Sequence, residues 1–375
     1  MGDFTKVPAL CGIVTIKLDG ASKDSLVTIT YRNTNKKRVK IYGINSILPY
    51  GVPYAIFECT DAEYKKPDDK FDYIPVFMLA DIEGYYSRKC PSCNKYFRTK
   101  TTTVKMCPYC RIVNQAHFFI TDEQLNYIKD YTKIYINAVN TKQNVVFDLD
   151  LIKEMENSAK PEYNFFEKKQ QTTFTCDKCG LETNIMGLYG YCPNCGQRNS
   201  LKVLENQLEQ LQKRVDVTRY TTSEREERNG EWREITKQCV SYFEAFARDM
   251  IFETKIIVPT LPKRIKILGK ISFHNPIRAN EILEKCFGID LLDGIDKKNQ
   301  RFIEKRFLRR HIYEHRGGIV DQKYIDKTKE KSLKAGQLLR ETRSNLSTLI
   351  NLVKKMAINL DKDFHSFAIE DRDDG

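Results

Sequence analysis

The chain carries four Cys-x-x-Cys pairs: Cys90-Pro91-Ser92-Cys93, Cys107-Pro108-Tyr109-Cys110, Cys176-Asp177-Lys178-Cys179 and Cys192-Pro193-Asn194-Cys195. Each such turn presents two thiolates to one metal ion. Thirteen residues separate the first two pairs and twelve separate the last two, so each couple of turns completes a tetrahedral four-sulfur site that suits zinc. The sequence therefore predicts two zinc ribbons with two structural Zn²⁺ ions. Neither ribbon leaves a ligand position open for catalysis.

Iron in a rubredoxin-like site and disulfide bonding are the alternative interpretations of these pairs. Gly180 and Gly196 follow the second cysteine of their turns, where a positive φ lets backbone amides turn toward the sulfurs. Each ribbon either replaces a hydrophobic core in a small β unit or forms a recognition surface. Basic and aromatic residues around the first ribbon, among them Tyr96, Arg98 and Lys100, suit both roles.

The composition predicts a folded, basic chain of two or three domains. It has 375 residues, of which 41% are hydrophobic and 30% charged, a balance typical of globular domains. The net charge of +12 favours a polyanionic partner, and RNA or another nucleic acid is the commonest one. A Lys-rich proteome would give the same charge without such a partner.

Nothing in the sequence indicates a membrane or an export signal. There is no run of 18 apolar residues and no apolar core near Met1, so we expect neither a spanning helix nor a signal peptide. Four further cysteines stand apart from the pairs, in contexts typical of buried thiols: Cys11, Cys59, Cys239 and Cys286. With metal-binding thiolates, they indicate a reducing compartment and thus a cytoplasmic location.

Residue patterns predict a multidomain α+β chain. β-branched and alternating stretches between residues 13 and 78 predict strands, and Leu201, Leu204, Leu208, Leu211 and Val215 mark one helical seam. Apolar spacing predicts a last helix from Lys327 to Leu360. The expected order is a β-rich domain (1–85), zinc ribbon 1 (86–118), a mixed insert (119–171), zinc ribbon 2 (172–200), a linker helix (201–221) and an all-α helical domain (222–375).

A second chemical signal lies at Arg310-His311-Ile312-Tyr313-Glu314-His315. Cleavage of RNA without a metal needs a base for the ribose 2′-OH and a cation for the phosphorane, roles that suit His315 and Arg310. On an ideal helix these two residues point about 140° apart, so they can edge one groove without sharing a face. A solvated basic helix end is the plain alternative. A metal site on His311 and His315 is another, although no third ligand is evident.

The longer stretch Phe307-Leu308-Arg309-Arg310-His311-Ile312-Tyr313-Glu314-His315-Arg316-Gly317-Gly318-Ile319-Val320-Asp321, with Tyr324, resembles the HEPN superfamily. Its ribonuclease members have Arg, a polar residue, three more residues and His, often followed by Gly-Gly-Ile-Val-Asp. Residues 242–249 also resemble an early helix of that family. The resemblance covers residues 222–365. At the polar position after Arg, His311 stands where Asn or Asp is more familiar.

The resemblance implies an all-α bundle that forms a homodimer, with two Arg–His motifs meeting across the interface. It implies metal-independent RNA cleavage that leaves a cyclic phosphate, commonly in toxin or antiviral abortive-infection systems with an antitoxin or a phage-derived trigger. Arg310 would bind phosphate, His315 would act as acid or base, and His311 would fill the polar position. Two alternatives stay open: a non-catalytic zinc-ribbon protein that binds nucleic acid, and a protein-interaction adaptor dimerised by the helical domain.

Overall fold

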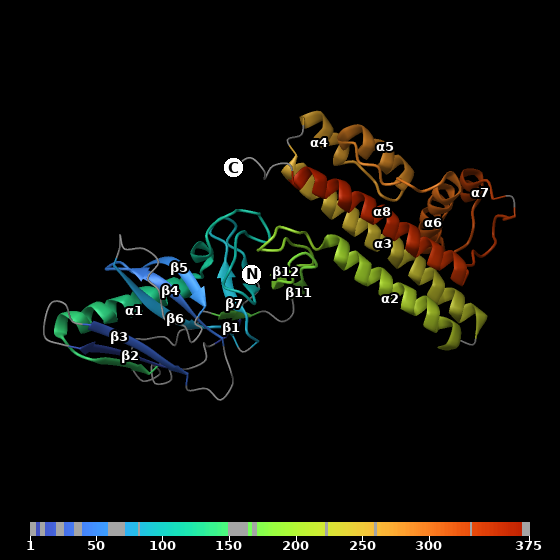
Figure 1. Ribbon diagram of the computed structural model, residues 1–375. Coiled ribbons are helices and arrows are strands. Elements are labelled where there is room, and N and C mark those ends of the chain that lie inside the picture. The colour runs from blue at the N-terminus through green and yellow to red at the C-terminus, as the bar shows by residue number, and fades with distance from the viewer. Residues whose placement is uncertain are drawn as a thin grey trace. The chain divides into compact units, whose positions relative to one another are not determined.

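Short antiparallel strands and one long helix build the N-terminal half of the chain, whereas the C-terminal half is helical (Figure 1). The computed structural model describes residues 5–7, 12–19, 26–33, 40–58, 72–81, 83–148, 164–166, 171–221, 224–258, 261–330 and 332–369. The chain divides into two compact units, residues 1–199 and 200–375. The mixed α+β class expected from the sequence is confirmed.

The first unit contains β1 (Thr5–Val7), β2 (Gly12–Asp19), β3 (Leu26–Asn33), β4 (Ile41–Ile47), β5 (Val52–Glu58), β6 (Tyr73–Leu79), β7 (Tyr86–Lys89), β8 (Tyr96–Thr99), the 3₁₀ turn η1 (Ala116–Phe119), α1 (Asp122–Thr141), β9 (Val145–Asp148), β10 (Asn164–Phe166), β11 (Gln171–Thr175) and β12 (Glu182–Met186). Two three-stranded sheets have the orders β3-β2-β9 and β5-β4-β6, and β1 pairs with β10. The strands predicted from the N-terminal pattern correspond to β2–β6. The segment between the ribbons supplies α1, β9 and β10, so it interleaves with the N-terminal strands.

Helix α1 packs on the β5-β4-β6 sheet and is fixed there by its first turn. Ile128 and Tyr131 share a core with Tyr42, Ile44, Ile74, Val76, Met78, Ala80 and Tyr86. Thr121 and Gln124 form a reciprocal capping box, which satisfies two amides that a helix start leaves unpaired. The Gln124 amide also donates to Tyr42 Oη and to the Ser87 carbonyl, each over 3.1 Å. The cap therefore ties the helix to two strands.

One four-stranded sheet, β11-β12-β8-β7, joins the two cysteine ribbons through antiparallel pairing of β12 with β8. Arg98 and Asn184 are opposite each other in this pairing, and the Arg98 guanidinium donates to the Asn184 side chain over 3.2 Å. Arg98 also pairs with Asp81 at 2.6 Å, both side chains being 3% exposed. The ribbons, which the sequence presents as separate segments, thus form one structural block.

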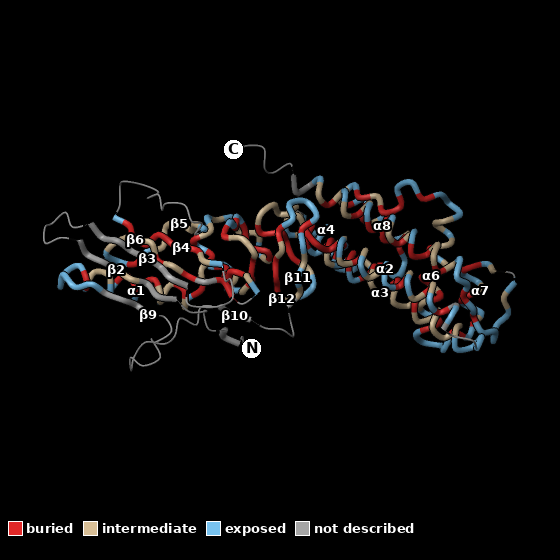
Figure 2. Tube along the Cα trace, turned by 60° about the horizontal axis from the view of Figure 1, so that its bottom comes forward, coloured by how far each residue is buried: buried red, intermediate tan, exposed pale blue. Residues whose placement is uncertain are grey.

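The second unit consists of α2 (Ser200–Thr221), α3 (Arg225–Ile257), α4 (Pro262–Leu268), α5 (Pro276–Phe287), α6 (Lys297–Arg316), α7 (Gln322–Thr328) and α8 (Arg343–Ile369). Helices α2, α3 and α8 pack side by side (Figure 1). Buried positions recur along all three (Figure 2). The seam predicted on α2 is confirmed at Leu204, Leu208, Leu211 and Val215, which are all buried. Among the helices that the structure describes, none has the length and apolar character that a membrane crossing requires.

The last helix does not start where the sequence predicts. Instead of one helix from Lys327 to Leu360, α7 ends at Thr328, and α8 begins only at Arg343. Lys329 adopts φ 53°, a left-handed conformation that ends α7, and Gly336, between the two helices, adopts φ 85°. Leu338, assigned by its spacing to a helical stripe, forms a β-bridge with Ile319. The prediction of one continuous helix was wrong, because the backbone between α7 and α8 pairs with the segment after α6 instead of continuing the helix.

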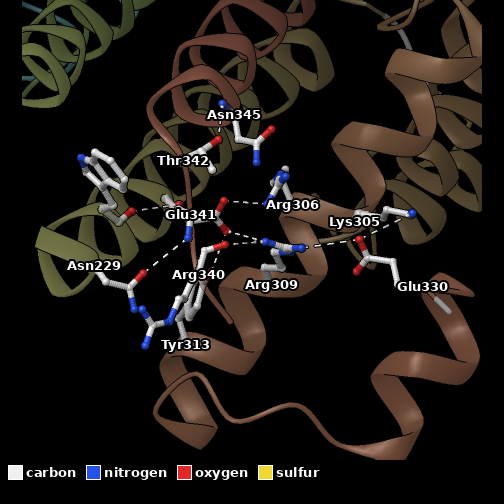
Figure 3. Close-up of polar contacts among 12 residues, drawn as sticks. Asn229, Lys305, Arg306, Arg309, Tyr313, Glu330, Arg340, Glu341, Thr342 and Asn345 are labelled. Carbon is white, nitrogen blue, oxygen red and sulfur yellow. Dashed lines mark hydrogen bonds and ion pairs between the residues drawn. The ribbon is translucent and has the colours of Figure 1, made fainter. Parts of the chain in front are cut away.

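That segment places Glu341 inside the unit (Figure 3). Its side chain has no exposed surface, and the two carboxylate oxygens contact Arg306 at 2.6 Å and Arg309 at 3.2 Å. Tyr313 donates its hydroxyl to the same carboxylate over 2.6 Å, and burial beside that carboxylate raises the pKa of Tyr313. Because the three partners lie on one face of α6, Glu341 fixes how that helix is rotated.

We predict that Glu341→Gln lowers the free energy of unfolding of the helical unit by about 3 kcal/mol, because two buried guanidinium groups lose their counter-charge. The only tryptophan, Trp232, lies in this unit, so its fluorescence during urea denaturation measures the change. The control is Glu226→Gln. Its carboxylate forms an exposed pair with Arg340, so a loss below about 1 kcal/mol is expected. Equal losses in the two variants would contradict the assignment.

Candidate functional site

The eight paired cysteines gather into two clusters, one for each predicted ribbon. Cys90, Cys93, Cys107 and Cys110 form the first, and Cys176, Cys179, Cys192 and Cys195 form the second, with the sulfurs of each cluster all within 4.8 Å of one another. Nearest sulfurs are 3.6 and 3.8 Å apart in the first cluster and 3.4 and 3.5 Å apart in the second. A disulfide would require about 2.05 Å, and none of the ten described cysteines forms one.

These distances fit four thiolates around one metal ion. Metal–sulfur bonds of about 2.3 Å in a tetrahedron place the sulfurs about 3.8 Å apart. After the second cysteine of each turn, Asn94, Arg111, Gly180 and Gly196 all have φ between 57° and 75°. The amides of these four residues donate to the carbonyl of the first cysteine of their turn. The positive φ expected at the two glycines is confirmed, and Asn94 and Arg111 adopt it as well.

The unpaired cysteines agree with the prediction where the structure describes them. Cys239 and Cys286 are buried free thiols, while Cys11 and Cys59 lie outside the described residues. The basic and aromatic residues around the first ribbon are engaged within the unit. Lys100 pairs with Glu182 at 2.8 Å, and the Arg98 guanidinium lies 4.7 Å from the centre of the Tyr85 ring. These contacts match a ribbon that serves as a structural core.

We predict that the purified protein carries two metal ions per chain and that Cys107→Ser lowers this number. Cys107 is fully buried, and loss of one thiolate opens its site. Because β8 and β12 share the sheet, ribbon two should also lose protection from hydrogen exchange. Elemental analysis and exchange mass spectrometry measure both effects. Cys286→Ser, a control outside the clusters, should keep two ions. Unchanged metal content in Cys107→Ser would refute the site.

In the second unit, the adjacent arginines of α6 have different surroundings. Arg309 is buried and contacts Glu341, Glu330 at 3.5 Å and the Tyr324 hydroxyl at 3.1 Å. Arg310 is half-buried and lines a cavity that Arg309 does not reach. Its buried Nε has no hydrogen-bond partner in the part of the chain that the structure describes. Arg309 therefore stabilises the fold, whereas Arg310 borders a cavity.

A cavity of about 470 Å³ is formed between α6, the turn before α5 and the first turns of α7. Arg310, His311 and His315, the three residues predicted from the sequence, all line it. The imidazole rings of His311 and His315 lie 4.6 Å apart between centroids, and the cavity wraps around the face of α6 that carries His311. Arg310 and His315 therefore border one space although they diverge on the helix. The other lining residues are Ser272, His274, Asn275, Phe307, Leu308, Ile312, Arg316, Asp321, Lys323, Tyr324 and Lys327.

His274 is a third histidine in this cavity, and the sequence did not point to it. It lies in the turn before α5, and its Nδ1 contacts the Glu244 carboxylate of α3. Three of the five histidines in the chain thus line one cavity. Glu244 belongs to the stretch 242–249 singled out by the resemblance, but its role was not predicted. The low histidine content was the one available signal, since it makes such a gathering unusual.

Burial and neighbouring charges set the protonation of these groups. Desolvation, followed by the neighbouring His315 and Arg310, lowers the pKa of His311 below its ordinary value. Desolvation raises the pKa of Glu244 above its ordinary value, against the opposing effects of His274, Arg310 and Arg248. The cavity thus combines the His311 and His315 imidazoles, a guanidinium and a carboxylate–imidazole pair, groups suited to proton transfer and anion binding.

The alternative of a metal site on His311 and His315 gains no third ligand. Within the described residues, the two cysteine clusters are the only groups of three or more potential metal ligands that converge. The sequence was also compared with protein-family models, curated proteins and solved structures, and none of them matched.

We predict that Glu244→Gln raises the melting temperature at pH 8 but not at pH 4. A carboxyl whose pKa is raised in the folded state contributes stability below its ordinary pKa of 4.5 and loses that contribution as the pH rises through the folded value. Gln removes the charge that opposes folding at pH 8 and mimics the protonated acid at pH 4. Calorimetry at both pH values tests this. A melting temperature of Glu244→Gln below that of wild type at pH 8 would contradict the prediction.

Proposed function

We propose that this protein is a metal-independent endoribonuclease of the HEPN type, with its active site in the cavity of Arg310, His311 and His315. The observation that carries the proposal is the convergence of the Arg310 guanidinium and three histidines on one cavity. The resemblance described above supports it independently, as does the net charge of +12, which favours binding of a polyanion. The proposal includes an all-α bundle of the HEPN type and zinc as the ion of both cysteine clusters.

The residues have complementary roles in the proposed reaction. His315 takes the proton from the ribose 2′-OH, and the 2′-oxygen attacks the adjacent phosphorus. Arg310 stabilises the negative charge of the phosphorane. The P–O5′ bond then breaks, and His274, with Glu244 as counter-charge, donates a proton to the departing oxygen. The products are a 2′,3′-cyclic phosphate and a 5′-hydroxyl. His311 orients the phosphate next to His315.

The same proposal extends to the setting and the assembly. Antiphage defence or toxin-like abortive infection is the setting, with the β strands and ribbons of the first unit sensing a trigger or holding RNA. A homodimer would bring two Arg–His motifs together. The competing role, nucleic-acid binding by the basic residues of ribbon one without catalysis, has less support, because Arg98 is buried and already paired with Asp81.

We predict that Arg310→Ala slows RNA cleavage by about 10²- to 10³-fold, the usual effect of removing a group that stabilises transition-state charge. His315→Ala should have an effect at least as large. The melting temperature of Arg310→Ala should stay within a few degrees of wild type, because Arg310 carries no structural ion pair. The measurement uses purified protein and total RNA after a short exposure to EDTA, which tests metal independence.

Two matched variants separate chemistry from folding. Arg301→Ala removes an exposed arginine of the same helix outside the cavity and should cleave RNA at the wild-type rate. Arg309→Ala removes a buried structural arginine, so its main effect should be a lower melting temperature. If Arg310→Ala cleaves RNA as fast as Arg301→Ala, and is equally toxic when induced in bacteria, the proposed active site is wrong.

A further inference from the structure

A second cavity of the helical unit has no part in the function proposed above. Its volume is about 540 Å³, and it is formed by the first turns of α3 and the segment that leads into α8. Its lining residues are Arg225, Arg228, Asn229, Trp232, Arg340, Glu341, Thr342 and Arg343. The volume falls in the range of small-molecule sites. Four arginines face a single acidic residue, and the Glu341 carboxylate is already bound to Arg306 and Arg309.

Two buried donors beside this cavity lack acceptors. Asn229 is 4% exposed; its oxygen accepts the backbone N–H of Glu341 over 3.4 Å, but its Nδ2 has no partner within the described residues. The indole Nε1 of Trp232 is unpaired in the same sense. A buried donor without an acceptor is costly, so a ligand oxygen that reached these groups would remove a penalty present in the free protein.

The surrounding charges favour an anion. Arg340 pairs with Glu226 at 2.5 Å and Arg343 with Asp216 at 2.6 Å. These carboxylates are 60% and 43% exposed, so the pairs contribute little and are readily exchanged. Thr342 caps the first turn of α8, accepting from the Asn345 amide over 3.2 Å. The start of this long helix therefore adds its positive dipole end to the arginines.

One wall of the cavity suits a planar base. The Arg228 guanidinium lies 5.9 Å from the centre of the Trp232 ring, and indole and guanidinium planes both stack on nucleobases. We propose that this cavity binds a nucleotide, with its phosphates on the arginines and the buried donors and its base against Trp232. The site is separate from the Arg310 cavity, and its occupation does not depend on RNA cleavage by that cavity.

Trp232 is the only tryptophan of the chain, so its fluorescence reports the site directly. We expect saturable quenching with ATP and with AMP, and at least tenfold weaker responses with adenosine, which lacks phosphate, and with tripolyphosphate, which lacks a base. Free N-acetyltryptophanamide corrects for absorption by the nucleotides. An equal response to tripolyphosphate would overturn the assignment of a base site. A response to an RNA oligonucleotide alone would overturn the nucleotide in favour of a strand-binding groove.

Asn229→Asp tests the geometry. It keeps an oxygen for the Glu341 amide and replaces the unpaired donor with a negative charge, so ATP affinity should fall at least tenfold. Asn351→Asp, an exposed change of the same kind on α8, should bind ATP normally. If Asn229→Asp does not fold, Arg225→Ala, which alters an exposed side chain, replaces it and should weaken ATP several-fold at unchanged melting temperature. Wild-type affinity in the folded variants, or no response of the wild type to any nucleotide, would refute the proposal.

Discussion

The helical unit depends on the buried carboxylate of Glu341. A charge without exposed surface is tolerated only when it is paired and fully hydrogen-bonded, and Arg306, Arg309 and Tyr313 meet that requirement from one face of α6. Their side chains cannot rotate away without leaving the carboxylate unpaired. The rotation of α6 is therefore fixed, and as a consequence the neighbouring face, with Arg310, His311 and His315, is presented to the cavity.

In the first unit, the cysteine clusters and the strands between them stabilise the fold. Its ribbons have few apolar residues of their own, and Cys90, Phe97, Val104, Cys107, Phe119 and Ile185 make up the core around the first cluster. Metal coordination by four thiolates can supply the folding free energy that such a core lacks. The shared strand pairing of β8 with β12, together with the buried Arg98–Asp81 pair, makes the two clusters parts of one block.

Local patterns in the sequence were sufficient for the features that depend on local spacing. The cysteine turns, the seam from Leu204 to Val215 and the Arg310–His315 pair were all visible in the sequence because each residue lies within one or two turns of the next one in its pattern. The sequence failed where distant segments meet. Glu341 was hidden in a predicted helix, and His274 and Glu244 belong to the cavity only because the turn before α5 and α3 pack beside α6. The pairing of the two ribbons depends on β8 and β12, which are more than 80 residues apart.

The arginine-lined cavity and the histidine-lined cavity of the helical unit differ in the chemistry open to them. Guanidinium groups stay protonated throughout the physiological range, so a cavity lined by Arg225, Arg228, Arg340 and Arg343 can bind anions but cannot exchange protons with them. Imidazole nitrogens can both donate and accept protons, so the cavity of His274, His311 and His315 can do both. Glu341 links the two cavities. Its backbone amide donates to Asn229 beside the arginine-lined cavity, and its carboxylate binds Arg306 and Arg309 of α6, the helix that carries His311 and His315. A displacement of this one residue would therefore alter the arginine-lined cavity and the orientation of the histidines together.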